Sequence, residues 1–183
     1  GLGCGLGTGE TTAAWTAKFL SSAGAPLILD ADGINVLEGH AHLLHQAKRP
    51  VLLTPHPLEF SRLSGLTVKA IQADRAHIAR TFAAEYGITL LLKGANTVVT
   101  DGKTTLINPT GSSALAKGGS GDALFGMICA LAAQGTQLLE AAAIAAYLHG
   151  MAGQRLAKIY SEYGVLPSDL PAEAARILAE WGY

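Results

Sequence analysis

Short apolar runs alternate along the chain with longer segments in which apolar residues recur at helical spacing. Three apolar runs predict buried strands that end in polar residues, at 26–32 (PLILDAD), 51–57 (VLLTPHP) and 88–94 (ITLLLKG). The helical spacing predicts helices at 10–22, 67–86, 122–134, 138–156 and 171–181. A hairpin is expected over 97–107, with Asp101 and Gly102 at its turn.

This alternation predicts an α/β fold in three layers, with a mostly parallel central sheet covered by helices on both faces. No shift in composition and no repeat marks a boundary, so we expect a single domain over 1–183. In a parallel sheet the carboxyl ends of the strands meet at one edge, where ligands bind. Polar residues follow the predicted strands at that edge, namely Asp30, Asp32, Thr54, His56 and Lys93.

Composition narrows the classes of function. Hydrophobic residues make up 49% of the chain and charged residues 15%. The net charge of −1 lacks the positive excess that is typical of proteins that bind nucleic acid or an acidic membrane surface. Cys4 and Cys129 form neither a metal-ligand pattern nor a disulfide framework, which favours a reducing compartment and hence the cytoplasm. The most apolar stretch, 138–148, is short and contains Glu140, so it predicts a buried helix and not a membrane span.

The first nine residues, GLGCGLGTG, place glycine at every odd position. No register gives G-x-G-x-x-G and no G-K-[ST] follows, so the segment is neither a dinucleotide-binding fingerprint nor a P-loop. Two explanations stay open: a tight connection that needs positive φ, or close approach of the backbone to a ligand. Because the chain opens on Gly1 inside this loop and without methionine, we expect that it lacks an N-terminal part of its fold.

A second glycine-rich stretch, AKGGSGDALFGM, surrounds the single acid Asp122 and leads directly into a predicted helix. Its glycines allow successive N–H groups to point into one concavity, to which the helix adds its positive N-terminal end. Such an anion hole suits a phosphoryl group, and a carboxylate beside it can accept the proton of an attacking hydroxyl. The alternative is that Asp122 only complements the helix dipole, although that role needs no neighbouring glycines.

Each polar residue at the strand ends has two explanations. Asp32 either caps a helix over 33–37 or joins Asp30 in a network of water or Mg²⁺ near phosphates. His56, which stands between two prolines, is either a structural residue or one that positions a ligand. Lys93 follows three leucines and either faces solvent or binds phosphate as a point charge.

Five motifs in a fixed order carry a resemblance to a known family: GLGCGLG, LDADGIN, LTPHPLEFSRL, LLKGANTVV and GGSGDALFGMICALAAQG. Together they resemble the ADP- or ATP-dependent NAD(P)H-hydrate dehydratases, repair enzymes with a ribokinase-like fold. The resemblance runs from Gly3 almost to the C-terminus. The last motif is typical of ribokinase-like enzymes, and TPHP with KGANTVV indicates the dehydratase branch. The chain departs from the family pattern at Cys4, Leu58 and Ser120, where the family has proline, glycine and threonine.

The resemblance implies roles for the matching residues. It assigns the adenine nucleotide, ADP or ATP, to Lys93, Gly94, Ala95, Asn96, Thr97 and Gly121. It assigns the hydrated NADH or NADPH to Gly3, Gly5, Gly7, His56 and Asp122, with Gly5 as the first choice within the loop. The anion hole consists of Gly119, Ser120 and Gly121, and Asp122 is the expected catalytic base. Mg²⁺ is expected with the nucleotide, and a homo-oligomer is expected as the assembly.

In the implied reaction Asp122 takes the proton from the hydroxyl of the hydrated ring as that hydroxyl attacks the terminal phosphoryl group. The phosphate ester then leaves, and NADH or NADPH is regenerated. Two alternatives stay open: a ribokinase-like kinase for a vitamin precursor or sugar, and a non-catalytic nucleotide-binding fragment. The TPHP stretch disfavours the kinase.

Overall fold

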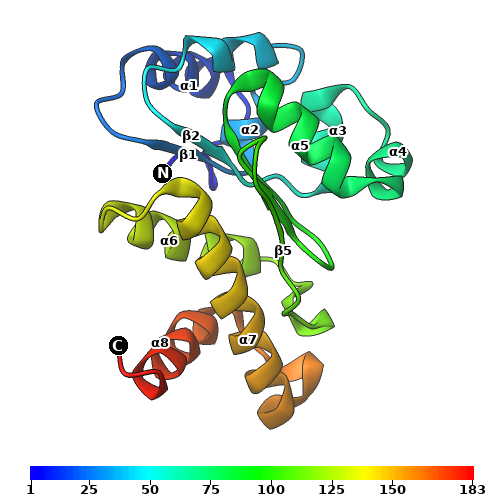
Figure 1. The fold of residues 1–183 in the computed structure, drawn as a ribbon, viewed down its shortest axis with the longest axis vertical. Coiled ribbons are helices and arrows are strands. Elements are labelled where there is room, and N and C mark those ends of the chain that lie inside the picture. The colour runs from blue at the N-terminus through cyan, green and yellow to red at the C-terminus, as the bar shows by residue number, and fades with distance from the viewer. The chain divides into compact units, whose positions relative to one another are not determined.

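The computed structural model describes the whole chain, residues 1–183, which forms two compact units. The N-terminal unit is Gly1–Ile107 and the C-terminal unit is Asn108–Tyr183. Figure 1 shows the strands in the N-terminal unit and a group of helices in the C-terminal unit.

The N-terminal unit alternates strands with helices, as the apolar pattern predicts. Its elements are α1 (Glu10–Ser22), β1 (Leu27–Leu29), α2 (Asp32–Asn35), η1 (Ala41–Gln46), β2 (Val51–Leu53), α3 (Pro57–Ser64), α4 (Val68–Ala73), α5 (Arg75–Tyr86), β3 (Thr89–Leu92), β4 (Val98–Thr100) and β5 (Thr105–Ile107). The strands form one sheet in the order β1-β2-β3-β4-β5. β1, β2 and β3 run parallel, and β4 and β5 add an antiparallel hairpin. The predicted strands and hairpin are thereby confirmed.

Alternate strand residues point to opposite faces of the sheet, and both faces are buried. Leu29, Leu53 and Leu90 lie on one face and share a core with apolar side chains of α1, α3 and α5. Leu52 and Leu91 lie on the other face and are also fully buried. Each fully buried leucine is worth about 1.5–3 kcal/mol, which explains why these strands read as unbroken apolar runs.

The single helix predicted over 67–86 is wrong, because the chain breaks at Asp74. The backbone of Asp74 has φ −150°, and its carboxylate accepts a hydrogen bond from the amide of His77 at 3.2 Å. A short acidic side chain that bonds to nearby backbone in this way ends one helix and starts the next. A further helix, α3, was not predicted, although a proline at the first helical position is a recognised start signal.

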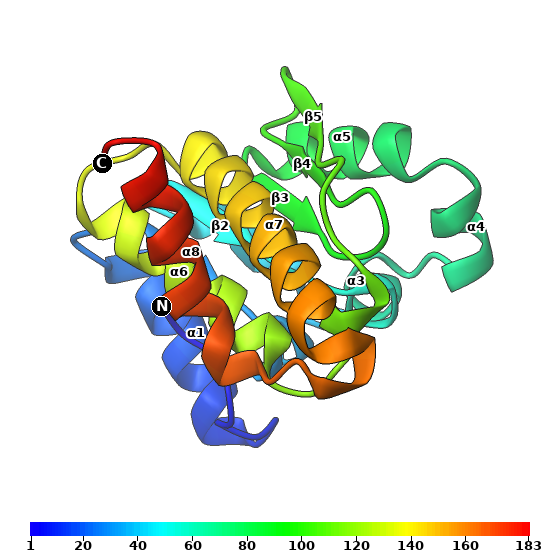
Figure 2. The ribbon, with the colours of Figure 1, turned by 90° about the horizontal axis from the view of Figure 1, so that it is seen from below.

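The C-terminal unit is helical. It consists of η2 (Ser113–Leu115), α6 (Ser120–Ala133), α7 (Leu138–Gly164), η3 (Pro167–Asp169) and α8 (Leu170–Glu180). α7 packs against both α6 and α8 (Figures 1 and 2), around a core that includes Leu148, Leu156 and Ile177. α6 starts two residues earlier than predicted because Gly119 forms its N-cap in a left-handed conformation. None of the helices has both the length and the apolar character that crossing a membrane requires.

Candidate functional site

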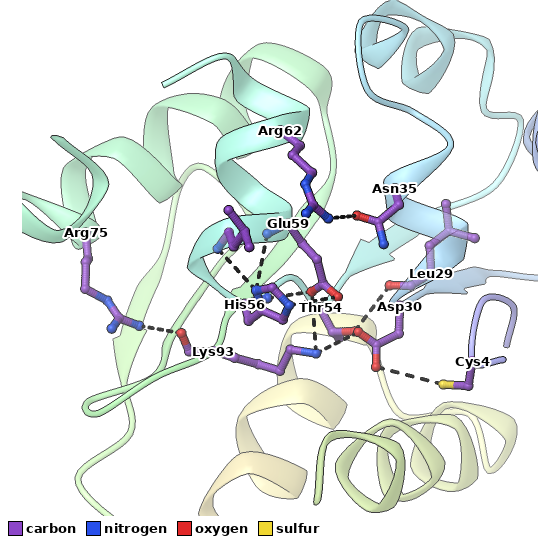
Figure 3. A network of polar contacts seen from close by, with 11 residues as sticks. Cys4, Leu29, Asp30, Asn35, Thr54, His56, Glu59, Arg62, Arg75 and Lys93 are labelled. Atoms are coloured by element: carbon purple, nitrogen blue, oxygen red, sulfur yellow. Dashed lines mark hydrogen bonds and ion pairs between the residues drawn. The ribbon is translucent and has the colours of Figure 1, made fainter. Parts of the chain in front are cut away.

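Charged side chains meet at the carboxyl ends of the parallel strands of the N-terminal unit (Figure 3). The Nζ of Lys93, after β3, lies 2.8 Å from Oδ1 of Asp30, after β1, and 3.8 Å from Oε2 of Glu59 in α3. Asp30 and Glu59 are only 2% and 6% exposed. Lys93 is therefore neither turned freely to solvent nor an unpaired cation, because the two buried carboxylates hold its ammonium group.

His56 is the N-cap of α3, and its ring orientation is fixed by that role. Its Nδ1 accepts hydrogen bonds from the amides of Leu58 and Glu59, at 3.1 and 3.2 Å. The Glu59 carboxylate in turn accepts from the amide of His56 at 2.8 Å, which completes a capping box. Since Nδ1 is an acceptor, the ring proton lies on Nε2. The side chain is 46% exposed and its Nε2 lies 3.3 Å from Oε1 of Glu59, so the same histidine caps a helix and contacts the buried carboxylate that also lies near Lys93.

Asp32 holds the glycine loop in place. The helix-capping explanation for Asp32 is wrong, because the N-cap of α2 is Ala31 and no side chain caps that end. The Asp32 carboxylate instead accepts a hydrogen bond from the amide of Gly7 at 2.8 Å. Ala31, between the two acids, has φ +46°, a conformation that costs energy in a residue with a side chain.

The three loop glycines that the resemblance assigns to the hydrated cofactor differ in their surroundings. Gly3 is buried with φ +141°, and a Cβ there would overlap the carbonyl oxygen of Asp30. Gly5 and Gly7 have φ +71° and +72°, are exposed, and would have open space around a Cβ. Close approach to the protein's own backbone accounts for Gly3, whereas Gly5 and Gly7 leave bare backbone on the surface.

Residues 93–97 form a tight exposed turn after β3. Gly94 has φ +144° and Asn96 has φ +54°, and the hydroxyl of Thr97 donates to the carbonyl of Gly94 at 2.9 Å. Gly94, Ala95 and Asn96 are exposed. The turn thus presents backbone groups outward while its own hydrogen bond closes it.

Arg75, which the sequence did not single out, braces this turn. Its Nη2 donates to the carbonyls of Leu92 and Lys93, at 2.8 and 3.1 Å. A Cβ on Gly94 would overlap Nη1 of the same guanidinium group. Burial lowers the pKa of Arg75.

The glycine-rich stretch of the C-terminal unit forms the start of α6. Gly119 has φ +92°, and Asp122 lies exposed in the first turn. The amide of Ser120 donates to the carbonyl of Lys117 at 3.2 Å, so this member of the predicted anion hole is engaged within the turn. The amides of Gly121 and Asp122 have no acceptor in the chain. Two N–H groups and a carboxylate are therefore available together at one helix N-terminus.

Two residues missed by the sequence reasoning tie this stretch to other parts of its unit. The Nζ of Lys117 donates to the carbonyls of Tyr163 and Val165, at 2.7 and 2.8 Å. The Nε2 of His149, in α7, lies 3.0 Å from the carbonyl oxygen of Ser120. Burial lowers the pKa of His149 to about 4, and the hydrogen bond to Ser120 only partly opposes this shift.

Comparisons with known proteins agree with one another. Residues 1–176 match the family described as NAD(P)H-hydrate dehydratase. The ADP-dependent (S)-NAD(P)H-hydrate dehydratase of Neisseria meningitidis is 39% identical over 184 residues, which cover 98% of this chain and 61% of that protein. The bifunctional NAD(P)H-hydrate repair enzyme Nnr of Moorella thermoacetica is 42% identical over 171 residues, 92% of this chain and 32% of that protein. The chain thus spans 32% to 61% of the length of these relatives.

Solved structures show the same fold. The ADP/ATP-dependent NAD(P)H-hydrate dehydratase of Bacillus subtilis, crystallised with ATP and Mg²⁺, superposes with a TM-score of 0.88 at 33% identity and covers 98% of this chain and 64% of its own. A ribokinase-like superfamily protein of Enterococcus faecalis gives a TM-score of 0.74 at 30% identity, over 96% of this chain and 62% of its own. The predicted ribokinase-like α/β fold is confirmed.

Proposed function

We propose, because the chain belongs to the NAD(P)H-hydrate dehydratase family, that it takes part in the nucleotide-dependent dehydration of hydrated NADH or NADPH. The observation that carries this proposal is the first turn of α6. There the unpaired amides of Gly121 and Asp122 and the exposed Asp122 carboxylate stand together. Such a group suits transfer of a phosphoryl group to a hydroxyl. We propose further that the two units belong to one ribokinase-like domain.

Asp122 acts as the general base in this proposal. Hydroxide is a poor leaving group, so the ring hydroxyl first attacks the terminal phosphoryl group of ADP or ATP and loses its proton to Asp122, while the P–O bond to the nucleotide breaks and AMP or ADP leaves. The amides at the start of α6 stabilise the charge on the phosphoryl oxygens. The carbon–oxygen bond then breaks, pushed by the ring nitrogen's lone pair, and inorganic phosphate departs. Loss of a proton from the neighbouring ring carbon completes NADH or NADPH.

His56 and the glycine loop serve the hydrated cofactor. The capping bonds at Nδ1 and the contact of Nε2 with Oε1 of Glu59, at 3.3 Å, hold the half-exposed ring of His56 in a fixed orientation for the cofactor. Gly5 and Gly7 offer exposed backbone, whereas buried Gly3 supports the loop from beneath. Asp32 keeps the loop in position through the amide of Gly7.

The exposed turn after β3 serves the adenine nucleotide, with Gly121 on the phosphate side. Gly94, Ala95 and Asn96 offer backbone groups, while the ammonium group of Lys93 stays with Asp30. Lys93 occupies Oδ1 of Asp30, so Asp30 could reach Mg²⁺ directly only through Oδ2. Mg²⁺ enters the proposal only as an ion that accompanies the nucleotide phosphates. The protein is further proposed to act in the cytoplasm as a homo-oligomer.

The test mixes the purified protein with hydrated NADH, Mg²⁺ and either ADP or ATP, and follows the long-wavelength absorbance of NADH. Recovery is expected only with nucleotide, and Asp122→Asn should slow it at least about 100-fold. Glu140→Gln is the matched control, because Glu140 is also an exposed acid in a first helical turn but has no glycine turn beside it. That variant should retain wild-type rates.

Three outcomes would count against the proposal. Equal loss of activity in both variants would favour a dipole role for Asp122. A stable phosphoester without NADH recovery would favour the kinase alternative. Nucleotide-dependent thermal stabilisation without turnover would favour a binding module.

A further inference from the structure

The hydrogen bond from His149 to Ser120 acts on a peptide group whose other end is part of the proposed phosphate site. The carbonyl of Ser120 and the amide of Gly121 belong to one planar, trans peptide unit. In such a unit the C=O and the N–H point in opposite directions. A donor on the Ser120 oxygen from α7, at 3.0 Å, therefore adds to the helical geometry of α6 in holding the direction of the Gly121 N–H.

His149 is suited to be a permanent donor. It is 6% exposed, and burial keeps its ring neutral at physiological pH. A carbonyl oxygen can only accept, so the single proton of the neutral ring must lie on Nε2. The donor is thus present whenever the protein is folded near neutral pH, and it does not depend on a bound ligand.

A hydrogen bond at the carbonyl oxygen also polarises the peptide group, which makes its N–H a stronger donor. The Gly121 amide has no acceptor in the chain, so this added strength remains available to a ligand. Lys117 ties the same stretch to the carbonyls of Tyr163 and Val165 independently. The turn therefore has a second anchor, and His149 is not needed merely to keep it closed.

We propose that His149 is a positioning residue for phosphoryl transfer, which aims and polarises the Gly121 amide through the Ser120–Gly121 peptide group. The inference rests on the proposed function, since it gives that amide a phosphoryl oxygen to stabilise. His149 itself touches neither nucleotide nor substrate in this account.

The test compares two substitutions of similar size. His149→Gln keeps an N–H donor at similar reach, whereas His149→Leu keeps the apolar packing and removes the donor. We expect kcat to fall about tenfold in His149→Leu, less than the loss of a whole oxyanion donor, with the KM for nucleotide changed less than about twofold. His149→Gln should recover most of the lost kcat. Equal kcat in the two variants, whether both low or both unchanged, would overturn the proposal.

A second measurement needs no turnover. In ¹⁵N-labelled protein without ligands, the Gly121 amide proton should move upfield in His149→Leu and stay near its wild-type position in His149→Gln. The wild-type imidazole should show a protonated Nε2 and a bare Nδ1 at pH 7. A proton on Nδ1, or an unmoved Gly121 amide, would overturn the inference even if His149→Leu did not fold well enough for kinetics. If these signals behave as expected but hydrated NADH is not converted, the proposed function fails and the coupling through the peptide group stands.

Discussion

Replacing Lys93 with methionine should destabilise the N-terminal unit far more than loss of a surface lysine would. The change removes the cation that lies 2.8 Å from Asp30 and leaves that carboxylate, 2% exposed, without its partner. With an effective dielectric constant of about 20, Coulomb's law gives about 6 kcal/mol of attraction at this distance, most of which offsets the desolvation of the two charges. Removing one partner of a buried pair typically costs about 3–5 kcal/mol, and we expect a loss of unfolding free energy in that range.

Urea unfolding followed by tryptophan fluorescence measures this loss, in the absence of nucleotide. Lys103→Met is the control, because Lys103 is exposed at the hairpin turn, and it should change the unfolding free energy by less than about 0.5 kcal/mol. Adding Asp30→Asn to Lys93→Met should restore part of the stability, since the nearer of the two carboxylates that lost the ammonium group is then uncharged. A loss below about 1 kcal/mol for Lys93→Met, or strictly additive effects in the double variant, would show that the Asp30 carboxylate does not depend on the ammonium group of Lys93.

Three further predictions concern other parts of the molecule. Burial lowers the pKa of His149 to about 4, from an ordinary value of 6.5, so the folded state favours the neutral ring. The unfolding free energy should therefore fall by up to about 3 kcal/mol as pH drops from 6.5 towards 4. Denaturant titrations of His149→Gln should lack this part of the pH dependence. Gly3→Ala should lower the melting temperature more than Gly5→Ala, whose positive φ alone costs about 1 kcal/mol, because a Cβ at Gly3 overlaps the Asp30 carbonyl; equal melting temperatures would contradict this. Arg75→Ala should weaken nucleotide binding about tenfold, as measured by calorimetry, because the turn after β3 loses two hydrogen bonds that hold it. Unchanged affinity would mean that this turn does not contribute to nucleotide binding.

The strands were predictable because their side chains are buried on both faces, which leaves a continuous apolar run in the sequence. The break at Asp74 was not, because it depends on a local competition between helix continuation and a side-chain cap. The hairpin could be predicted from Asp101 and Gly102, because the hydrogen bonds that form its turn join residues close in sequence. Local turns and helix ends were thus predictable only where the sequence carried a well-known signal, such as Asp-Gly at a hairpin turn.

The meeting of Asp30, His56 and Lys93 at one edge follows from parallel strand topology, so the sequence could place them together. Their partners could not be predicted, since pairing depends on strand register and side-chain direction. Glu59 escaped notice because histidine is not a usual N-cap, which concealed the capping box. His149 lies in an alanine-rich helix with no motif around it, and only tertiary packing brings it to Ser120.

In the proposed reaction the ring hydroxyl of the hydrate becomes a phosphate ester with Asp122 as the base. Hydrated NADH that carries ¹⁸O in its ring hydroxyl tests this directly, because carbon–oxygen cleavage leaves that oxygen on phosphorus. Each inorganic phosphate released with NADH should contain one ¹⁸O atom, and Asp122→Asn should suppress labelled phosphate and NADH together. Unlabelled phosphate, with the ¹⁸O recovered in water, would contradict this reaction.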